Sequence, residues 1–348
     1  MATSLASQEG NNFEVSNEKE EEEQGNPQRA SEKINELFST LPKGKGWWAE
    51  HLFHYQGFWL SNRALEGLLL IQDNFKPQPS DIFLANTPKS GSTWLKALLF
   101  SIVNLSRYDF SSHPLLNTPP RDIFPFLDFY FQQNKPISDI ESLPSPRLFS
   151  SHLPYNLFPK SITASGCRFV SIWRDPKDVF VSQWHFMKKL RSKELPAVSM
   201  EEAFDLFCKG VSHYGPLWDH MSGYWKASLE SPEKILMLKY EDMKREPLVQ
   251  VKRLAEFLGQ PFSIEEENKG VVQEIINLCS FDSLRNLQVN KTRDGPSNEG
   301  RPVKNPDFFR KGEVGDWKNH LVAEMAEYID QIIKDRLCGG GLASGFCP

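Results

Sequence analysis

A cation, a glycine and three hydroxyls stand together at the predicted start of a helix: Lys89, Ser90, Gly91, Ser92 and Thr93. A short apolar run, predicted to be a strand, comes before them, and a mostly apolar helical segment follows. Backbone N–H groups at a helix start, a nearby cation and hydroxyl donors can all bind one anion. The pattern therefore predicts a phosphate-binding loop. The alternative is a Pro/Gly turn whose polar side chains face solvent.

The position of the lysine separates this loop from that of the nucleoside triphosphatases. In the motif G-x-x-x-x-G-K-[ST] the lysine follows the second glycine, whereas Lys89 stands two residues before Gly91. This difference indicates a task other than holding β- and γ-phosphates with magnesium. The segment from Thr93 to about Leu105 is apolar nearly all round, so we expect a helix buried against a sheet.

Composition and charge are those of a globular protein. The 348 residues are 39% hydrophobic and 12% aromatic, which is enough for one large domain or two modest ones. The net charge of −5 falls within residues 1–30, which hold seven Glu against Lys19 and Arg29. Global charge therefore predicts no nucleic-acid or anionic-membrane partner.

Residues 1–40 are predicted to be an acidic, disordered tail and residues 41–348 one domain. The sequence has no signal-peptide pattern, and no stretch has the length of a membrane span. Five cysteines, odd in number and without C-x-x-C pairs, argue against a disulfide framework or a zinc site. We expect a cytoplasmic protein with reduced thiols.

Predicted strands and helices alternate along the domain, which is typical of an α/β fold with a central parallel sheet flanked by helices. After the strand that leads into Lys89, the predicted strands are 147–151, 167–173 and 234–240. The predicted helices other than the one after the loop are 61–75, 176–190, 200–209, 216–228, 247–258 and 265–278. Ligands of such folds bind at the carboxyl ends of the strands.

Each of the four predicted strands ends at a residue that can do chemistry. The first ends at Lys89 and the second runs into His152. The third ends at Arg174, with Ser182 in the following helix, and the fourth ends at Tyr240. A guanidinium and a hydroxyl can hold a second phosphate. Singly, these residues have ordinary explanations as a hydrogen-bonded histidine, a capping ion pair or a core tyrosine, but their coincidence favours a site.

Aromatic residues gather in two further segments. The segment 41–59 includes Trp47 and Trp48, which can line a pocket or simply pack in the core. The segment 119–131 holds five aromatic residues between prolines without a clear period. It predicts an irregular aromatic wall or lid.

Three motifs, in order, resemble those of the cytosolic sulfotransferases. Residues 87–94, Thr-Pro-Lys-Ser-Gly-Ser-Thr-Trp, are similar to the 5′-phosphosulfate loop of that family. Residues 173–182, Trp-Arg-Asp-Pro-Lys-Asp-Val-Phe-Val-Ser, resemble its 3′-phosphate-binding strand and helix. Residues 308–317, Phe-Phe-Arg-Lys-Gly-Glu-Val-Gly-Asp-Trp, resemble its C-terminal R-K-G-x-x-G-D-W loop. The resemblance runs from about residue 40 to the C-terminus, and Tyr214-Gly-Pro looks most like the plant branch.

The resemblance implies transfer of a sulfuryl group from 3′-phosphoadenosine 5′-phosphosulfate (PAPS) to a hydroxyl of a small apolar acceptor. The acceptor would be of the flavonoid, steroid, hydroxyjasmonate or desulfoglucosinolate type. In such a reaction a cation stabilises charge on the leaving bridging oxygen, and a base takes the proton of the hydroxyl. Lys89 and His152 match these two roles. We expect no metal, because helix N–H groups and cations can hold the donor.

The resemblance also implies a set of donor contacts. They are Lys89, Ser90, Gly91, Ser92, Thr93 and Trp94 at the 5′-phosphosulfate and adenine, Arg174 and Ser182 at the 3′-phosphate, Tyr240 at adenine, and Arg310, Lys311 and Gly312 in the closing loop. Cys279 replaces a Thr of animal members, which puts one adenine-side hydrogen bond in doubt. Val322 and Ala323 replace the Thr and Val of the animal dimerisation motif, so we infer no animal-type dimer.

Two other functions are alternatives to the enzyme. A P-loop kinase would share the fold, but it should carry its lysine after the second glycine and a carboxylate for magnesium. A non-catalytic nucleotide sensor should have lost Lys89 or His152, and both are present. If His152 is not the base, His185 and His213 are the next candidates by chain position. The sequence does not identify the acceptor.

Overall fold

The computed structural model describes residues 34, 36–133, 135–292, 294–298 and 301–338. The chain divides into two units, Met1–Thr40 and Leu41–Pro348. The predicted disordered tail lies almost wholly outside the described residues, although 36–40, at its end, are helical. All elements of the site belong to the second unit.

A four-stranded parallel sheet forms the centre of the second unit, in the order β5-β4-β6-β7. The strands are β4 (Ile82–Ala85), β5 (Leu148–Ser151), β6 (Arg168–Trp173) and β7 (Ile235–Lys239). Nearly all of their residues are buried, as expected for apolar strands covered on both faces. Because the strands are parallel, their carboxyl ends lie together at one end of the sheet. The predicted parallel α/β fold is confirmed.

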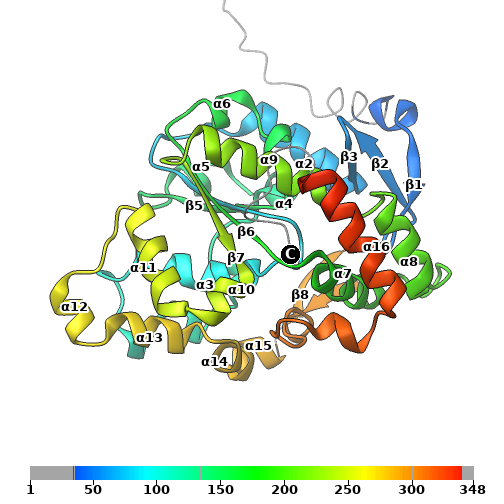
Figure 1. Cartoon of the computed structure of the whole chain (residues 1–348). Coiled ribbons are helices and arrows are strands. Elements are labelled where there is room, and N and C mark those ends of the chain that lie inside the picture. The colour runs from blue at the N-terminus through cyan, green and yellow to red at the C-terminus, as the bar shows by residue number, and fades with distance from the viewer. Residues whose placement is uncertain (1–33, 35, 134, 293, 299–300, 339–348) are drawn as a thin grey trace, which may run out of the picture. The chain divides into compact units, whose positions relative to one another are not determined.

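Helices cover both faces of this sheet (Figure 1). On one side lie α2 (Asn62–Asn74) and α9 (Leu217–Glu230). On the other lie α3 (Ser92–Val103), α11 (Pro247–Phe257) and α13 (Val271–Leu278), whose apolar side chains form one buried cluster with the sheet. The helix α3, which follows the predicted phosphate loop, is thus held rigidly between the sheet and other helices.

The described chain has further α-helices. They are α4 (Leu127–Tyr130), α5 (Ile137–Glu141), α6 (Lys160–Thr163), α7 (Pro176–Leu190), α8 (Met200–Cys208), α10 (Tyr240–Arg245), α12 (Ile264–Asn268), α14 (Phe281–Asn286), α15 (Gln288–Thr292) and α16 (Ala323–Ile333). The segment 265–278, predicted as one helix, is two: Gly270 separates α12 from α13 with a φ of 77°. Glycine adopts this left-handed conformation without a Cβ clash, so the apolar period continues across a break in the helix.

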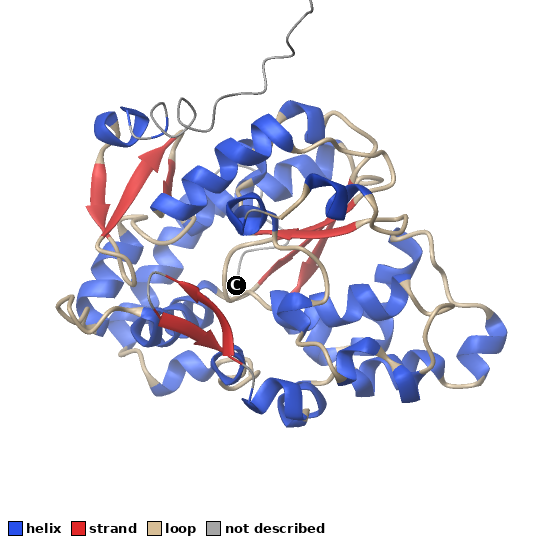
Figure 2. Cartoon of the chain, turned by 180° about the vertical axis from the view of Figure 1, so that it is seen from behind, coloured by secondary structure: helices blue, strands red, loops and turns tan. Residues whose placement is uncertain are grey.

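Two antiparallel sheets were not predicted from the sequence. The first consists of β1 (Lys43–Lys45), β2 (His51–Tyr55) and β3 (Phe58–Leu60), in that order. The second pairs β8 (Asp294–Asn298) with β9 (Arg301–Lys304). Figure 2 shows both as separate from the parallel sheet. Among the described residues, no helix combines the length and apolar character needed to cross a membrane.

Candidate active site

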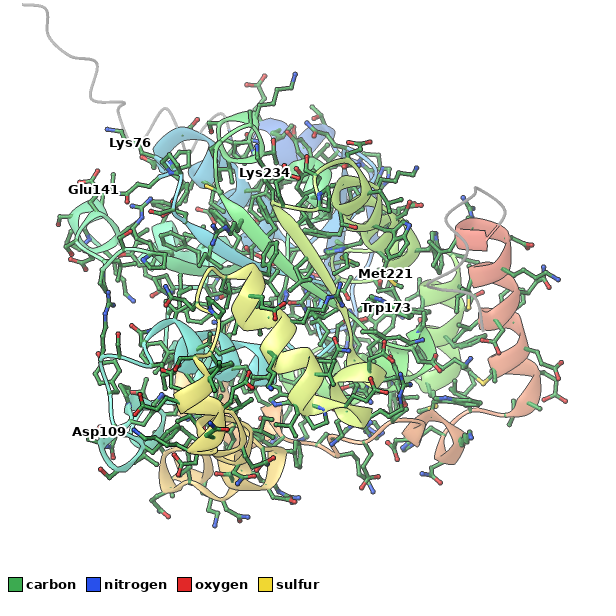
Figure 3. The ribbon with its side chains drawn as sticks, turned by 60° about the vertical axis from the view of Figure 1, so that its left-hand side comes forward. Lys76, Asp109, Glu141, Trp173, Met221 and Lys234 are labelled. Carbon is green, nitrogen blue, oxygen red and sulfur yellow. The ribbon has the colours of Figure 1, made fainter. Side chains whose placement is uncertain are left out.

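A cavity of about 1090 Å³ opens at the carboxyl ends of the parallel strands. Figure 3 labels Trp173, the last residue of β6, and Lys234, the residue before β7, which mark the two opposite ends of the parallel strands. The predicted site residues that line the cavity are Lys89, Gly91, Ser92, Thr93, Trp94, His152, Arg174, Ser182, Tyr240, Arg310, Lys311 and Gly312. Ser90 is the exception, because its buried hydroxyl hydrogen-bonds the hydroxyl of Thr87.

The loop before α3 has the tight backbone that an anion site requires. Lys89 has a φ of 69° and Gly91 a φ of 120°, both in the left-handed range. A Cβ at Gly91 would lie 3.0 Å from the Tyr240 ring, so only glycine fits between the loop and that ring. Helix α3 begins without a side-chain cap, which leaves its first backbone N–H groups available to a ligand.

Lys89 is a half-buried cation in a basic cluster. Its Nζ lies 3.9 Å from the centroid of the Phe186 ring and 5.8 Å from that of Phe308. Burial, together with the charges of Arg310 and Arg174, lowers the pKa of Lys89 to about 7. Three cations so close together repel one another, and a polyanion would relieve that repulsion.

Arg174 is held from several directions at the end of β6. Its guanidinium lies 4.5 Å from the Tyr240 ring centroid, pairs with Asp178 at 3.1 Å and donates to the backbone carbonyl of Glu313. The ring of Tyr240 meets that of Trp94 edge to face, with centroids 5.8 Å apart. Arg174 is therefore fixed in place before any ligand binds.

Three buried N–H groups on this side of the cavity make no hydrogen bond within the described chain. They are Nε of Arg174, Nε of Arg310 and Nε1 of Trp94. An unsatisfied buried donor costs about 1–3 kcal/mol, so these groups favour a ligand that accepts hydrogen bonds. A phosphorylated nucleotide, with its phosphate oxygens, fits that requirement.

The C-terminal loop is anchored by Asp178, a residue that the sequence analysis gave no role. Besides pairing with Arg174, its carboxylate accepts the backbone N–H groups of Gly315 at 2.8 Å and Trp317 at 3.0 Å. Gly312 has a φ of 70°, and a Cβ there would lie 2.5 Å from the ring of Phe281. One buried carboxylate thus connects α7, Arg174 and the loop that carries Arg310.

His152 is held in one tautomer. Its Nδ1 lies 2.7 Å from the backbone carbonyl oxygen of Asn86, which can only accept. Nδ1 therefore carries the proton, and Nε2 keeps its lone pair. The ring also contacts the rings of Phe126, at 5.0 Å, and Tyr214, at 5.6 Å. Burial lowers the pKa of His152 to about 3, so the ring is neutral at neutral pH.

Asp128, in α4, supports His152 and was not predicted. Its buried carboxylate accepts hydrogen bonds from the Ser151 hydroxyl, from the backbone N–H of His152 at 2.9 Å and from the Tyr214 hydroxyl at 2.7 Å. Burial raises the pKa of Asp128 in spite of these donors. The one signal in the sequence was an Asp inside an otherwise aromatic segment, and its partners are 23 to 86 residues away.

The aromatic segment 119–131 forms part of the cavity wall, as predicted, through Phe124, Phe126, Phe129 and Tyr130. The segment near residue 47 divides between its two predicted roles. Trp47 packs against Phe180 and Phe207, whereas Trp48 lines the cavity and stacks on His213 at 5.1 Å. His185 is not among the lining residues and contacts His320. Within the described chain, no cluster of three His, Cys, Asp or Glu is placed to hold a metal.

A phosphate-type loop on a parallel sheet, together with a cluster of cations and a neutral imidazole in the same cavity, is typical of a group-transfer enzyme. The model of the sulfotransferase domain family matches residues 79–341. The chain belongs to the sulfotransferase family, and the predicted enzyme class is confirmed.

Individual relatives are similar over most of the chain. Cytosolic sulfotransferase 16 of Arabidopsis thaliana is 45% identical over 90% of this chain and 93% of its own. A flavonol sulfotransferase-like protein of Flaveria bidentis is 46% identical over 89% of this chain and 99% of its own. The crystal structure of a putative steroid sulphotransferase of Arabidopsis thaliana is 37% identical, with a TM-score of 0.71 over 91% of this chain and 97% of its own.

A more distant structure shares the fold. The crystal structure of a mouse sulfotransferase complexed with PAP, the 3′,5′-bisphosphate of adenosine, is 23% identical, with a TM-score of 0.61 over 84% of this chain and 96% of its own. At this identity the likeness concerns the fold alone.

Proposed function

We propose that this protein transfers the sulfuryl group of PAPS to a hydroxyl of a small, largely apolar acceptor in the cytoplasm. The family, the PAP bound by the mouse relative and the three unsatisfied N–H groups support PAPS as the donor. Relatives named as cytosolic sulfotransferases support the location. Relatives named for flavonols and the aromatic wall support an apolar, hydroxylated acceptor.

We call the part of the cavity lined by Lys89, residues 91–94, Arg174, Ser182, Tyr240 and residues 310–312 the donor half. It would hold PAPS through the cations and N–H groups described above. The first turn of α3 and Lys89 would bind the 5′-phosphosulfate, and Arg174, Ser182 and Arg310 the 3′-phosphate. Trp94 and Tyr240 would contact the adenine. PAPS supplies the sulfuryl group on a phosphate that serves as the leaving group.

His152 is the proposed general base, and its tautomer is the observation that carries this assignment. Its Nε2 can accept the proton of the acceptor hydroxyl, while the Nδ1 hydrogen bond to Asn86 keeps the ring oriented. Burial is the main cause of the low pKa of His152, about 3, and the charges of Lys96 and Lys89 lower it further. The negative charges of a bound donor oppose that shift and make His152 a stronger base.

Lys89 is proposed to stabilise the charge that develops on the bridging oxygen of the leaving phosphate. Desolvation of the ammonium in the cavity strengthens this interaction, because screening by water is weaker there than in bulk solvent. The ammonium rests against Phe186 and needs no carboxylate to hold it there. Lys89 can therefore turn toward the donor without first breaking an ion pair.

A panel of hydroxylated acceptors with sulfur-labelled PAPS tests the proposed function. We expect labelled sulfate on phenolic or alcoholic hydroxyls of planar, apolar acceptors. Calorimetric titration with PAP should show binding by the same preparation. Tight PAP binding without transfer to any acceptor would support a nucleotide sensor instead.

A further inference from the structure

The charges that line the cavity are strongly unbalanced. Of the Lys, Arg, Asp and Glu residues in its wall, nine are basic and one, Asp122, is acidic. Five of the basic residues lie in or beside the donor motifs. The remaining four, Lys96, Arg107, Arg121 and Lys135, belong to none of those motifs. The donor therefore does not account for the whole positive charge of the cavity.

Lys96 is the most buried of these four cations. It is 5% exposed and stands on α3, where it is the one charged side chain on an otherwise uncharged helix. Its Nζ donates to the backbone carbonyl of Arg121 at 2.9 Å and, at 3.5 Å, to that of Phe124. Both partners are neutral, and no carboxylate of the described chain lies within ion-pair distance. A buried cation without a counter-ion is costly unless a ligand supplies one.

The nearby carboxylates are occupied by other groups. Asp122 pairs with Arg121 at 3.5 Å. Asp128 accepts three hydrogen bonds, from the Ser151 hydroxyl, the His152 backbone N–H and the Tyr214 hydroxyl. Both acids raise the pKa of Lys96, but burial outweighs them and lowers it to about 7. The acids in the wall thus leave the positive charge of Lys96 incompletely balanced.

Lys96 and His152 contact the same aromatic ring. The Nζ of Lys96 is 5.7 Å from the centroid of the Phe126 ring, and the His152 ring is 5.0 Å from the same centroid. The ammonium and the proposed base are therefore both next to Phe126 in the cavity wall. A planar acceptor along the aromatic wall could place its hydroxyl at His152 and a second polar group at Lys96.

We infer that the acceptor carries an anionic group, a carboxylate or a sulfate, which Lys96 binds about one aromatic ring away from the hydroxyl that is sulfated. This inference rests on the proposed function. Arg107, Arg121 and Lys135 contribute the positive potential that attracts such an acceptor into the cavity. We call the part of the cavity lined by His152, Lys96 and the segment 119–131 the acceptor half. Lys96 is thus a specificity-determining residue of the acceptor half.

Binding to the enzyme saturated with PAP tests the inference without requiring turnover. The probes are 3-(4-hydroxyphenyl)propanoate and its methyl ester, which differ in one charge. Calorimetry on the wild type should show the carboxylate binding roughly 10-fold or more tighter than the ester, as expected for a charge-assisted hydrogen bond. In Lys96→Met, and in Lys96→Gln if the first variant does not fold, this ratio should fall to near one.

Lys244→Met is the matched control. It removes the same charge from the same cavity on the donor side, where Lys244 lies 5.9 Å from the Trp94 ring. The preference for the carboxylate should persist in this variant. PAP binding reports that each variant is folded.

Two results would overturn the inference: equal or tighter binding of the ester by the wild type, or an undiminished preference in the folded Lys96 variants. Sulfation of neutral phenols in the same preparation separates this failure from that of the proposed function. If neutral phenols are sulfated and the ester binds as well as the carboxylate, the inference alone fails. If the carboxylate is preferred but no acceptor is sulfated, the anion site stands and the proposed function fails.

Discussion

The donor half and the acceptor half of the cavity are built in different ways. The donor half uses three contiguous motifs, each at the end of a strand or in the C-terminal loop, and its groups are fixed by buried hydrogen bonds. The acceptor half combines residues from distant parts of the chain, among them Asn86, Lys96, Asp128 and Tyr214. A nucleotide of fixed structure can be bound by a few compact motifs, whereas an acceptor pocket is shaped by packing.

Replacing His152 should lower kcat and leave the affinity for PAP nearly unchanged. With a weakly acidic alcohol, His152→Ala should lower kcat by about 100-fold or more, because the hydroxyl would lose its proton without a base. An acidic phenol, already partly ionised near neutral pH, should lose less. Steady-state kinetics on both acceptors, with calorimetric PAP affinity, measure the effect.

His213→Ala is the control for this substitution, because His213 also lines the cavity and stacks on Trp48. It should change kcat by a similar factor for both acceptors, as expected of a packing residue. Near-normal turnover of both acceptors by His152→Ala would exclude His152 as the base and make His213 the next candidate.

Replacing Arg174 should reduce the selectivity of the donor half for a 3′-phosphorylated nucleotide. The wild type should bind PAP more tightly than adenosine 5′-phosphate by roughly 10–150-fold, the equivalent of about 1.5–3 kcal/mol for a charge-assisted contact. Arg174→Met should remove most of this selectivity. Arg168→Met, at the other end of β6, is the control and should keep it. Equal affinity of the wild type for the two nucleotides would contradict the assignment of the 3′-phosphate site.

The pH dependence of PAP binding sharpens the role of Lys89. Its pKa is about 7 in the free protein, and a bound anion raises it, so binding above pH 7 takes up a proton. Affinity should therefore fall as pH rises from 7 to 9, by at most about 10-fold per pH unit for one group. Calorimetry in buffers of different ionisation enthalpy measures the uptake. A Lys89→Met variant with undiminished proton uptake would assign the effect to another group.

Chelation should have the smallest effect, because the donor half relies on cations and N–H groups. We expect sulfuryl transfer to continue in EDTA at an unchanged rate. Loss of activity in EDTA and its return with magnesium would favour the P-loop kinase alternative.

The fold and the donor half were largely predictable from local patterns. Apolar runs followed by Lys89, His152, Arg174 and Tyr240 predicted both the parallel sheet and the strand ends at which the cavity opens. Each prediction needed only residues close in sequence. Ser90 shows the limit of this approach, because a motif does not reveal that its hydroxyl turns to Thr87.

The supports of the site were not predictable because they depend on packing between distant segments. Asp128 meets Ser151 and Tyr214 only after α4, β5 and the loop before α9 have come together. The strands β1 to β3 were not predicted because β1 is only Lys-Gly-Lys and the aromatic residues of β2 and β3 resemble ordinary core aromatics. Gly270 divides two helices without disturbing the apolar period, so the period alone predicted one.

The anchoring of the C-terminal loop by Asp178 has an evolutionary consequence. Its carboxylate accepts hydrogen bonds from the backbone N–H groups of Gly315 and Trp317, which follow Arg310 in the sequence, and so fixes the loop after that residue. Substitutions at exposed positions beyond residue 317 that contact neither Asp316 nor α7 should therefore leave the groups proposed to bind the 3′-phosphate in place. That downstream stretch contains the positions at which this chain departs from the animal dimerisation motif, and Val322 is 58% exposed there. A change in subunit association at such exposed positions would thus leave the proposed nucleotide site unchanged.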